Sequence, residues 1–250
     1  MTGVAKGTVL KLLCGLGMAC AEYQDKALRD LVCRRIQCDE VWAYCYAKEK
    51  NVPDRHKGEF GYGDIWTWVA LDADSKLVVC WYLGRRDAED ASRFIANLAE
   101  RLRHKVQLTT DGHRAYLDAV EGAFKFNVDY AMLVKLYGAP TQEEQRRYSP
   151  AKCIGTHVAV IEGDPDMEKV STSYVERQNL TMRMSMRRFT RLTNAFSKKA
   201  ENLACALALH FMHYNFCRVH KTVKMTPAMA AGVADHVWTV GEIVGLLESN

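Results

Sequence analysis

RIQCDEVWAYCY (35–46) is an apolar stretch rich in aromatic and branched residues, with Asp39 and Glu40 near its start. Side chains of this kind favour a β-strand. Two further stretches of the same kind, DIWTWVAL (64–71) and KLVVCWYL (76–83), flank the turn residues DADS. This arrangement predicts an antiparallel hairpin that continues from the first strand.

A helix and a fourth strand follow the hairpin in the sequence. Residues 87–103 carry apolar side chains at helical spacing, and Asp87 is a suitable N-cap. Residues 106–109 predict a short strand that runs into Asp111. The resulting order is that of a ribonuclease-H-like α/β fold, in which three antiparallel strands precede a crossover helix and a parallel strand.

The rest of the chain is expected to add flanking helices and further parallel strands. The predicted elements are a helix at 116–122, strands at 126–134 and 156–161, a polar loop at 137–152, and helices at 171–188, 197–218 and 240–247. We divide the chain into an N-terminal region (1–32), a ribonuclease-H-like domain (33–218) and a C-terminal helical tail packed on the core (219–250).

The N-terminal stretch TGVAKGTVLKLLCGLG (2–17) has the pattern of the second half of a helix-turn-helix. In this interpretation Val9, Leu12 and Leu13 form the buried stripe, and a charged helical linker (19–32) follows. The side chains that would then face a DNA major groove are Lys6, Thr8 and Lys11. A short surface helix is the alternative interpretation of the same residues.

The charge distribution and the cysteine spacing bear on whether the protein binds DNA or zinc. The net charge of +4 does not indicate a nucleic-acid partner by itself, but residues 177–199 contain seven basic residues and no acidic one. Such a run is usually a solvated helix face, and it indicates DNA binding only beside a reactive site. The nine cysteines show no CxxC spacing, which argues against a zinc ribbon and fits reduced thiols in the cytoplasm.

Three acids have positions that suit a shared metal site. Asp39 lies early in the first strand, Asp111 just past the fourth strand, and Glu176 in the first turns of a late helix. The first and fourth strands are neighbours in the predicted sheet, and a helix packed on it can bring the third acid close. Phosphoryl transfer suits two hard cations held by carboxylates, so two Mg²⁺ ions, with Mn²⁺ as a substitute, are expected. Four nearby acids compete as ligands, namely Glu40, Glu59, Asp64 and Asp72.

The helix that carries Glu176 predicts a binding face. Asn179, Arg183 and Arg187 share the face of Glu176 at helical steps. The opposite side is an apolar stripe that is expected in the core, formed by Val175, Met182, Met186 and Phe189. Cations beside a metal-binding acid suit a DNA phosphate backbone, although an amphipathic surface helix remains the alternative. His113 is a further candidate to contact the phosphate.

At these residues the sequence resembles a known family, the bacterial insertion-sequence transposases of the insertion-sequence-one type. The matching segments are CRRIQCDEVW (33–42), GDIWTWVALDADSKLVV (63–79), LTTDGHRAY (108–116), YVERQNLTMRMSMRRFTRLTNAFSK (174–198) and YNFCRVHKTVKMTPAMAAGV (214–233). The resemblance covers nearly the whole chain. The segment at 174–198 is the most specific, because it combines the acid, the asparagine and the spaced arginines.

The resemblance implies a DDE transposase that cleaves and joins DNA, with Asp39, Asp111 and Glu176 as metal-binding catalytic residues. Its implied partners are the double-stranded DNA of element ends and target, and a second copy of the chain, in the bacterial nucleoid and without a membrane. The expected DNA contacts are Lys6, Thr8, Lys11, Arg177, Asn179, Arg183, Arg187, Arg188 and Lys198.

The sequence departs from the family at its N-terminal end. Family members usually carry a zinc-binding module and a complete helix-turn-helix before this point, which puts independent recognition of element ends in doubt. Two other interpretations therefore stay open. One is a ribonuclease-H-fold nuclease that cleaves without joining, and the other is an inactive, truncated copy that only binds DNA.

Overall fold

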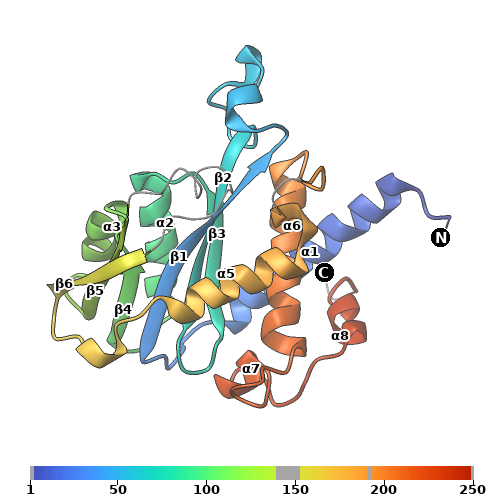
Figure 1. The fold of residues 1–250 in the computed structure, drawn as a ribbon. Coiled ribbons are helices and arrows are strands. Elements are labelled where there is room, and N and C mark those ends of the chain that lie inside the picture. Colours follow the sequence, from blue (N-terminus) through green and yellow to red (C-terminus); the bar gives the residue numbers. More distant parts are fainter. Residues whose placement is uncertain (1–2, 139–152, 191–192, 249–250) are drawn as a thin grey trace.

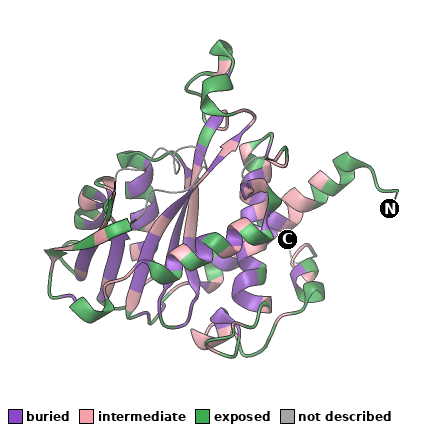
Figure 2. Cartoon of the chain, viewed as in Figure 1, coloured by how far each residue is buried: buried purple, intermediate pink, exposed green. Residues whose placement is uncertain are grey.

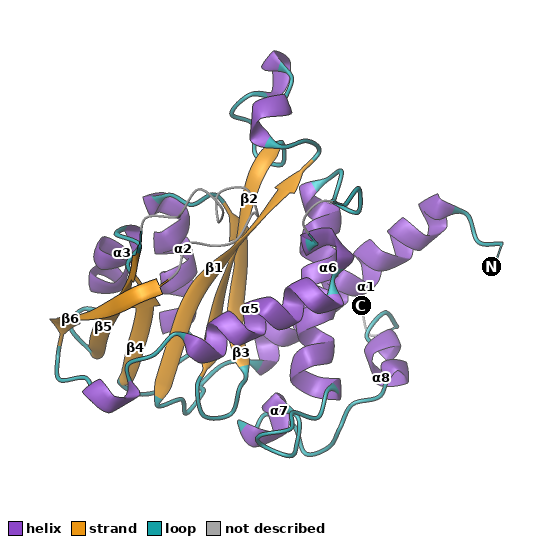
Figure 3. Ribbon diagram, viewed as in Figure 1, coloured by secondary structure: helices purple, strands orange, loops and turns teal. Residues whose placement is uncertain are grey.

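The computed structural model describes residues 3–138, 153–190 and 193–248. Its main elements are α1 (Lys6–Ala27), β1 (Arg35–Cys45), β2 (Gly63–Asp72), β3 (Val78–Gly84), α2 (Ala88–Ala99), β4 (Val106–Asp111), α3 (Ala115–Phe124), β5 (Val128–Tyr137), β6 (Cys153–Glu162), α5 (Ser173–Ser185), α6 (Ala200–Met212), α7 (Pro227–Ala230) and α8 (Val240–Gly245). Short 3-10 turns and a π-helical turn (His213–Cys217) connect them. Figure 3 shows the helices and strands in separate colours.

The strands form one mixed sheet of six in the order β3-β2-β1-β4-β5-β6. β1, β2 and β3 pair antiparallel, and β4 pairs parallel with both β1 and β5. The prediction of three antiparallel strands, a helix and a parallel strand is confirmed at this level, and the topology is compatible with a ribonuclease-H-like fold. One expectation was wrong: a further parallel strand was predicted, but β6 pairs antiparallel with β5 at the edge of the sheet.

Helices cover both faces of the sheet (Figure 1). One core cluster joins the side chains of Trp68, Phe94 and Tyr116 from β2, α2 and α3. The other cluster joins β1 and β2 to α5 and α6, and it contains the predicted stripe of Val175, Met182, Met186 and Phe189. Alternation along β2 explains the division, because neighbouring strand residues point to opposite faces. α7 and α8 add Ala228 and Ile243 to the first cluster.

The boundaries of the helices and strands agree with some of the predicted boundaries and differ from others. Asp87 caps α2 as predicted, and its side chain accepts a hydrogen bond from the Asp90 amide at 3.0 Å. β3 begins at Val78 and not at Lys76, whose positive φ of 67° places it in the turn. Most of the loop predicted at 137–152 lies outside the described residues. All nine cysteines are free, and the predicted buried ones, Cys45, Cys80 and Cys205, are buried.

The N-terminal region forms α1, one continuous helix of 22 residues. It spans the segment predicted as the second half of a helix-turn-helix and most of the predicted helical linker, but the predicted burial is wrong. Val9 and Leu12 are not in a buried stripe, since they are 53% and 58% exposed. The reason is that the second half of α1 packs on α6: a Cβ atom at Gly17 would lie 2.5 Å from Cys205, so glycine permits close helix contact. The first half projects from the body (Figures 1 and 2).

None of the helices in the described parts of the chain is long and apolar enough to cross a membrane.

Candidate metal centre

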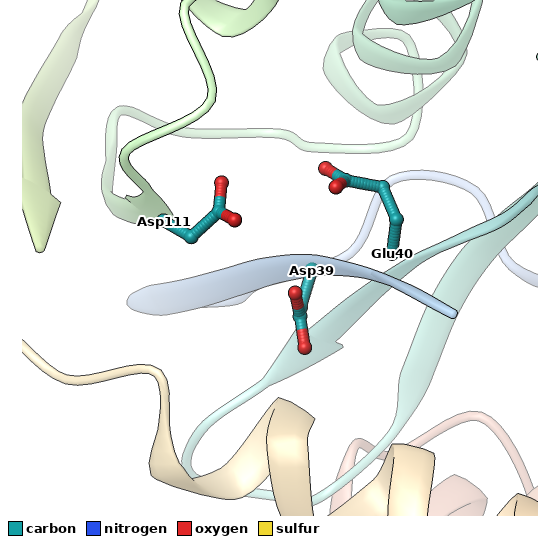
Figure 4. Close-up of side chains that lie close together, drawn as sticks. All are labelled: Asp39, Glu40 and Asp111. Carbon is teal, nitrogen blue, oxygen red and sulfur yellow. The ribbon is translucent and has the colours of Figure 1, made fainter. Parts of the chain in front are cut away.

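The register of two parallel strands brings Asp39 and Asp111 to the same level. β1 and β4 pair as Arg35↔Gln107, Ile36↔Leu108 and Gln37↔Thr109, and pairing then stops. Continuing this register by two residues would set Asp39 opposite Asp111. The two residues lie beyond the last β1–β4 pair (Figure 4), and both line one pocket.

Glu40 completes a cluster of three carboxylates with these two residues. One oxygen from each of Asp39, Glu40 and Asp111 lies within 4.8 Å of the others. Figure 4 shows Asp39 and Glu40 on opposite sides of β1, with Asp111 approaching from β4. Neighbouring strand residues point to opposite faces of a sheet, yet Asp39 and Glu40 both have an oxygen close to Asp111, which lies beyond the last β1–β4 pair.

The other three competing acids have different surroundings. Asp72 is buried and accepts hydrogen bonds from the backbone amide and hydroxyl of Ser75 in the β2–β3 turn. Glu59 and Asp64 are exposed near the tip of the β1–β2 hairpin. Within the described residues, only Glu40 of the four joins the cluster.

Burial and mutual repulsion act on the clustered acids. The pKa of Asp39 is raised to about 6, first by burial and then by the charge of Asp111. The pKa of Glu40 is raised to about 7 by the same two causes in the same order. Like charges in a poorly hydrated place disfavour the ionised forms, and a bound cation would relieve both effects.

Arg86 supplies positive charge to this cluster. Its Nε donates to Glu40 Oε2 at 3.0 Å, and its Nη2 donates to Asp111 Oδ2 at 3.5 Å. The guanidinium also lies over the ring of Trp66, 4.9 Å from the centroid. Sequence reasoning missed Arg86, because it precedes α2 in a connecting segment and no periodicity marks it. The Arg86 guanidinium is thus a positive charge in contact with two acids of the cluster.

Glu40 is the most deeply buried acid of the cluster. Its side chain is 1% exposed, and its neighbours are the Arg86 guanidinium and the Tyr116 hydroxyl, which both lower its pKa. A buried carboxylate is costly unless it is paired, and metal coordination is one way to offset that cost. Carboxylate oxygens are the ligands that Mg²⁺ and Mn²⁺ prefer. The donor set of Asp39, Glu40 and Asp111 therefore fits a hard divalent cation.

Asn179 holds Asp39 in place. The amide Nδ2 donates to Asp39 Oδ2 at 2.8 Å, from the middle of α5. The sequence predicted Asn179 as a DNA contact, but the residue is only 6% exposed. Its position on the face of Glu176 was predicted correctly, and that face turns toward the sheet. Asn179 orients a carboxylate and does not present its amide to a surface ligand.

Glu176 lies in the wall of the same pocket but outside the close cluster. Its Oε1 accepts from the Thr172 hydroxyl and from the Lys135 ammonium group. Its charge is one of the smaller causes that raise the pKa of Asp39. The three predicted acids thus share one cavity, with Asp39 and Asp111 paired closely and Glu176 set beside them.

Two acids of the cluster, Asp39 and Asp111, line a cavity of about 630 Å³, and Glu40 lies behind them outside its lining. The lining residues are Asp39, Arg86, Asp111, Gly112, His113, Arg114, Leu133, Val134, Lys135, Tyr137 and Glu176. Three of them are cations set around the acidic floor, an arrangement that suits an anionic ligand bound through a metal. His113 lines the cavity, but its ring packs near Trp68, and burial and then Arg86 lower its pKa.

The remaining predicted DNA contacts lie on several elements. Arg187 was predicted on the helix face of Glu176, but α5 ends at Ser185, so Arg187 and the adjacent Arg188 lie in the following 3-10 turn. Arg188 donates to the Ser197 hydroxyl at 2.7 Å. The other exposed residues of this set are Lys6, Thr8, Lys11, Arg177, Arg187 and Lys198, whereas Arg183 is partly buried.

Comparisons with known proteins give no family for this chain: no protein-family model matches it. A search of curated proteins likewise finds no match.

Proposed function

We propose that the protein is a metal-dependent DNA phosphoryl transferase of the DDE transposase type. The observation that carries this proposal is the convergence of Asp39, Glu40 and Asp111 at the point where β1 and β4 separate. The strand order, with Asp39 and Asp111 on adjacent strands, supports a ribonuclease-H-like catalytic domain. The resemblance of the sequence to insertion-sequence transposases supplies the substrate class.

Divalent metal ions, held by Asp39, Glu40 and Asp111 with Glu176 nearby, would neutralise charge on the attacking and leaving oxygens of a phosphodiester. Asn179 fixes the orientation of Asp39 through its 2.8 Å hydrogen bond. Arg114 and Lys135 line the cavity and would bind phosphate oxygens beside the scissile bond. Arg177 and Arg187 are exposed, and in this proposal they bind the backbone of duplex DNA farther along.

Nicking of supercoiled plasmid tests the cleavage part of the proposal. Wild-type protein should nick DNA with Mg²⁺ or Mn²⁺ and not with EDTA, and Asp111→Asn should lower the rate at least about a hundredfold, as expected for loss of charge stabilisation at the reacting phosphate. Asp64→Asn is the matched control, because this acid is exposed on the β1–β2 hairpin. Equal nicking activity of Asp111→Asn and wild type would contradict the assignment of Asp111 as a catalytic metal ligand.

A joining assay separates a transposase from a nuclease. Pre-cleaved DNA ends with free 3′-hydroxyls are incubated with a target plasmid and metal, and joined products are quantified. Joined products that disappear in Asp111→Asn support strand transfer. Cleavage without joining would favour the nuclease interpretation, and DNA binding without cleavage would favour a copy that only binds.

A further inference from the structure

A row of aromatic side chains begins beside the acid cluster and follows the β1–β2 hairpin. We call it the aromatic track, and its members are Trp42, Tyr44, Tyr46, His56, Tyr62, Trp66 and Phe196. All seven are partly exposed. The hairpin extends beyond the rest of the sheet (Figure 1).

Strand register places the start of the track. Trp42 and Trp66 are paired across β1 and β2, so their side chains share a face of the sheet. Alternation along β1 puts Glu40, Trp42 and Tyr44 on that face. One step toward the sheet centre, Trp68 is fully buried in the core cluster with α2 and α3. The track therefore starts where the helical cover of the sheet ends.

Ring contacts hold the track together in two groups, one next to β1 and one at the tip of the hairpin. Tyr44 contacts Trp42 at 5.8 Å between centroids and Phe196 at 4.7 Å. Farther out, Tyr46 meets Tyr62 at 4.9 Å, and Tyr62 stacks on His56 at 4.0 Å with an interplanar angle of 4°. From Glu40 to Tyr46 the strand spans six residues, or about 20 Å.

Cations accompany the rings. Lys198 lies over the Phe196 ring, 3.7 Å from its centroid, and Arg86 lies over Trp66. Arg86 also contacts Glu40 and Asp111, so a single residue links the track to the acid cluster. Partly exposed aromatic rings with interleaved cations are the combination that binds single-stranded nucleic acid, because every base has a flat face that stacks.

We infer that the aromatic track binds unpaired bases of a nucleic acid strand whose phosphodiester lies at the acid cluster. This inference rests on the proposed function and deepens it, since it assigns an unpaired strand next to the cleaved bond. Bases stack on the rings, and Lys198 and Arg86 contact the phosphates between them. Continuity with the acid cluster favours this ligand over a protein partner.

Binding without metal tests the inference apart from catalysis. Fluorescently labelled (dT)12 and a duplex of the same length are titrated with full-length protein in EDTA. Trp42→Leu and Tyr44→Leu should each weaken single-strand binding roughly tenfold, in line with the loss of one base-stacking contact, and should change duplex binding less than twofold. Phe126→Leu is the matched control, because Phe126 is 66% exposed and lies outside the track.

Conservative variants keep the test decisive if a leucine variant unfolds. Tyr44→Phe should bind (dT)12 as wild type does, and wild-type tryptophan fluorescence should be quenched by (dT)12. Trp42→Phe should keep binding and lose part of the quenching. The inference is overturned if the leucine variants fold and bind (dT)12 normally, if wild-type fluorescence is unchanged, or if the variants abolish self-association and leave DNA binding intact.

The same titrations separate the two proposals. Wild-type protein that binds neither DNA form would contradict the proposed function itself. Wild-type protein that cleaves DNA and binds both forms, with no effect of Trp42→Leu or Tyr44→Leu, would remove only the role of the aromatic track.

Discussion

At Glu40, burial and a nearby positive charge act on the same carboxylate in opposite directions. Its side chain is almost fully buried beside Asp39 and Asp111, and Arg86 neutralises it only in part. Burial dominates, because the pKa of Glu40 rises to about 7 despite the nearby guanidinium. A carboxylate in these surroundings lowers the stability of the fold until a cation binds beside it. Acids with raised pKa values of this kind are typical of functional sites.

Glu40→Gln should therefore stabilise the metal-free protein at high pH. The folded-state pKa of about 7 lies above the ordinary value of 4.5, so folding binds a proton between these values and stability falls as pH rises through them. The free energy of unfolding of the variant should exceed that of wild type by about 3 kcal/mol above pH 7 and equal it below pH 4.5.

Urea unfolding in EDTA across this pH range measures the effect. Glu121→Gln on α3 is the control, because Glu121 is exposed and does not line the cavity of Asp39 and Asp111. A Glu40→Gln variant that is less stable than wild type at pH 8 would show that the carboxylate is stabilised by its surroundings in the absence of metal.

At the scale of elements, α1 depends on a close contact with α6. Gly17 has no side chain, and an added Cβ would lie 2.5 Å from the backbone oxygen of Cys205. Gln24 strengthens the contact by donating from Nε2 to the Ala208 carbonyl oxygen at 3.0 Å. These two features fix the second half of the helix on the core.

Gly17→Ala should destabilise the protein by about 1–3 kcal/mol, because the methyl group forces α1 away from α6. Gly7→Ala is the opposite case: nothing lies within 4 Å of its added Cβ, so the higher helix propensity of alanine should stabilise by up to about 1 kcal/mol. Thermal unfolding of both variants measures the pair. Equal effects of the two substitutions would contradict the close packing at Gly17.

Local sequence patterns correctly predicted those helices and strands whose side-chain pattern or capping residue is clear. Alternating and branched residues predicted β1, the hairpin and β4, and Asp87 predicted the start of α2. The chain order then placed Asp39 and Asp111 on adjacent strands. The elements depend on residues near one another in sequence, whereas the adjacency of Asp39 and Asp111 follows from the order of the elements and the rules of strand connection.

The features that the sequence missed depend on contacts between distant residues. The predicted buried stripe of Val9 and Leu12 is exposed because only the second half of α1 packs on α6, and a helical pattern does not show which part of a helix meets a partner. Glu40 and Arg86 join the site because β4 leaves β1 after Gln37, and no residue type marks that separation. The role of Asn179 likewise follows from which face of α5 meets the sheet.

At the scale of the whole molecule, the acid cluster lies where the sheet divides. On one side β4 and β5 continue the sheet, and on the other the β1–β2 hairpin extends outward with the aromatic track (Figure 1). A cation held by Asp39 and Asp111 would link β1 to β4 just beyond their last paired residues. Metal binding should therefore stabilise the whole fold as well as complete the site.

Titration of the metal-free protein with Mn²⁺ by isothermal calorimetry tests the central claim most directly. Wild type and the control Asp64→Asn should bind Mn²⁺ saturably, and Asp39→Asn and Asp111→Asn should each weaken binding at least about tenfold, consistent with loss of a ligand carboxylate. Wild-type protein that binds no Mn²⁺, or an Asp39→Asn, Asp111→Asn double variant that binds it as tightly as wild type, would contradict the claim.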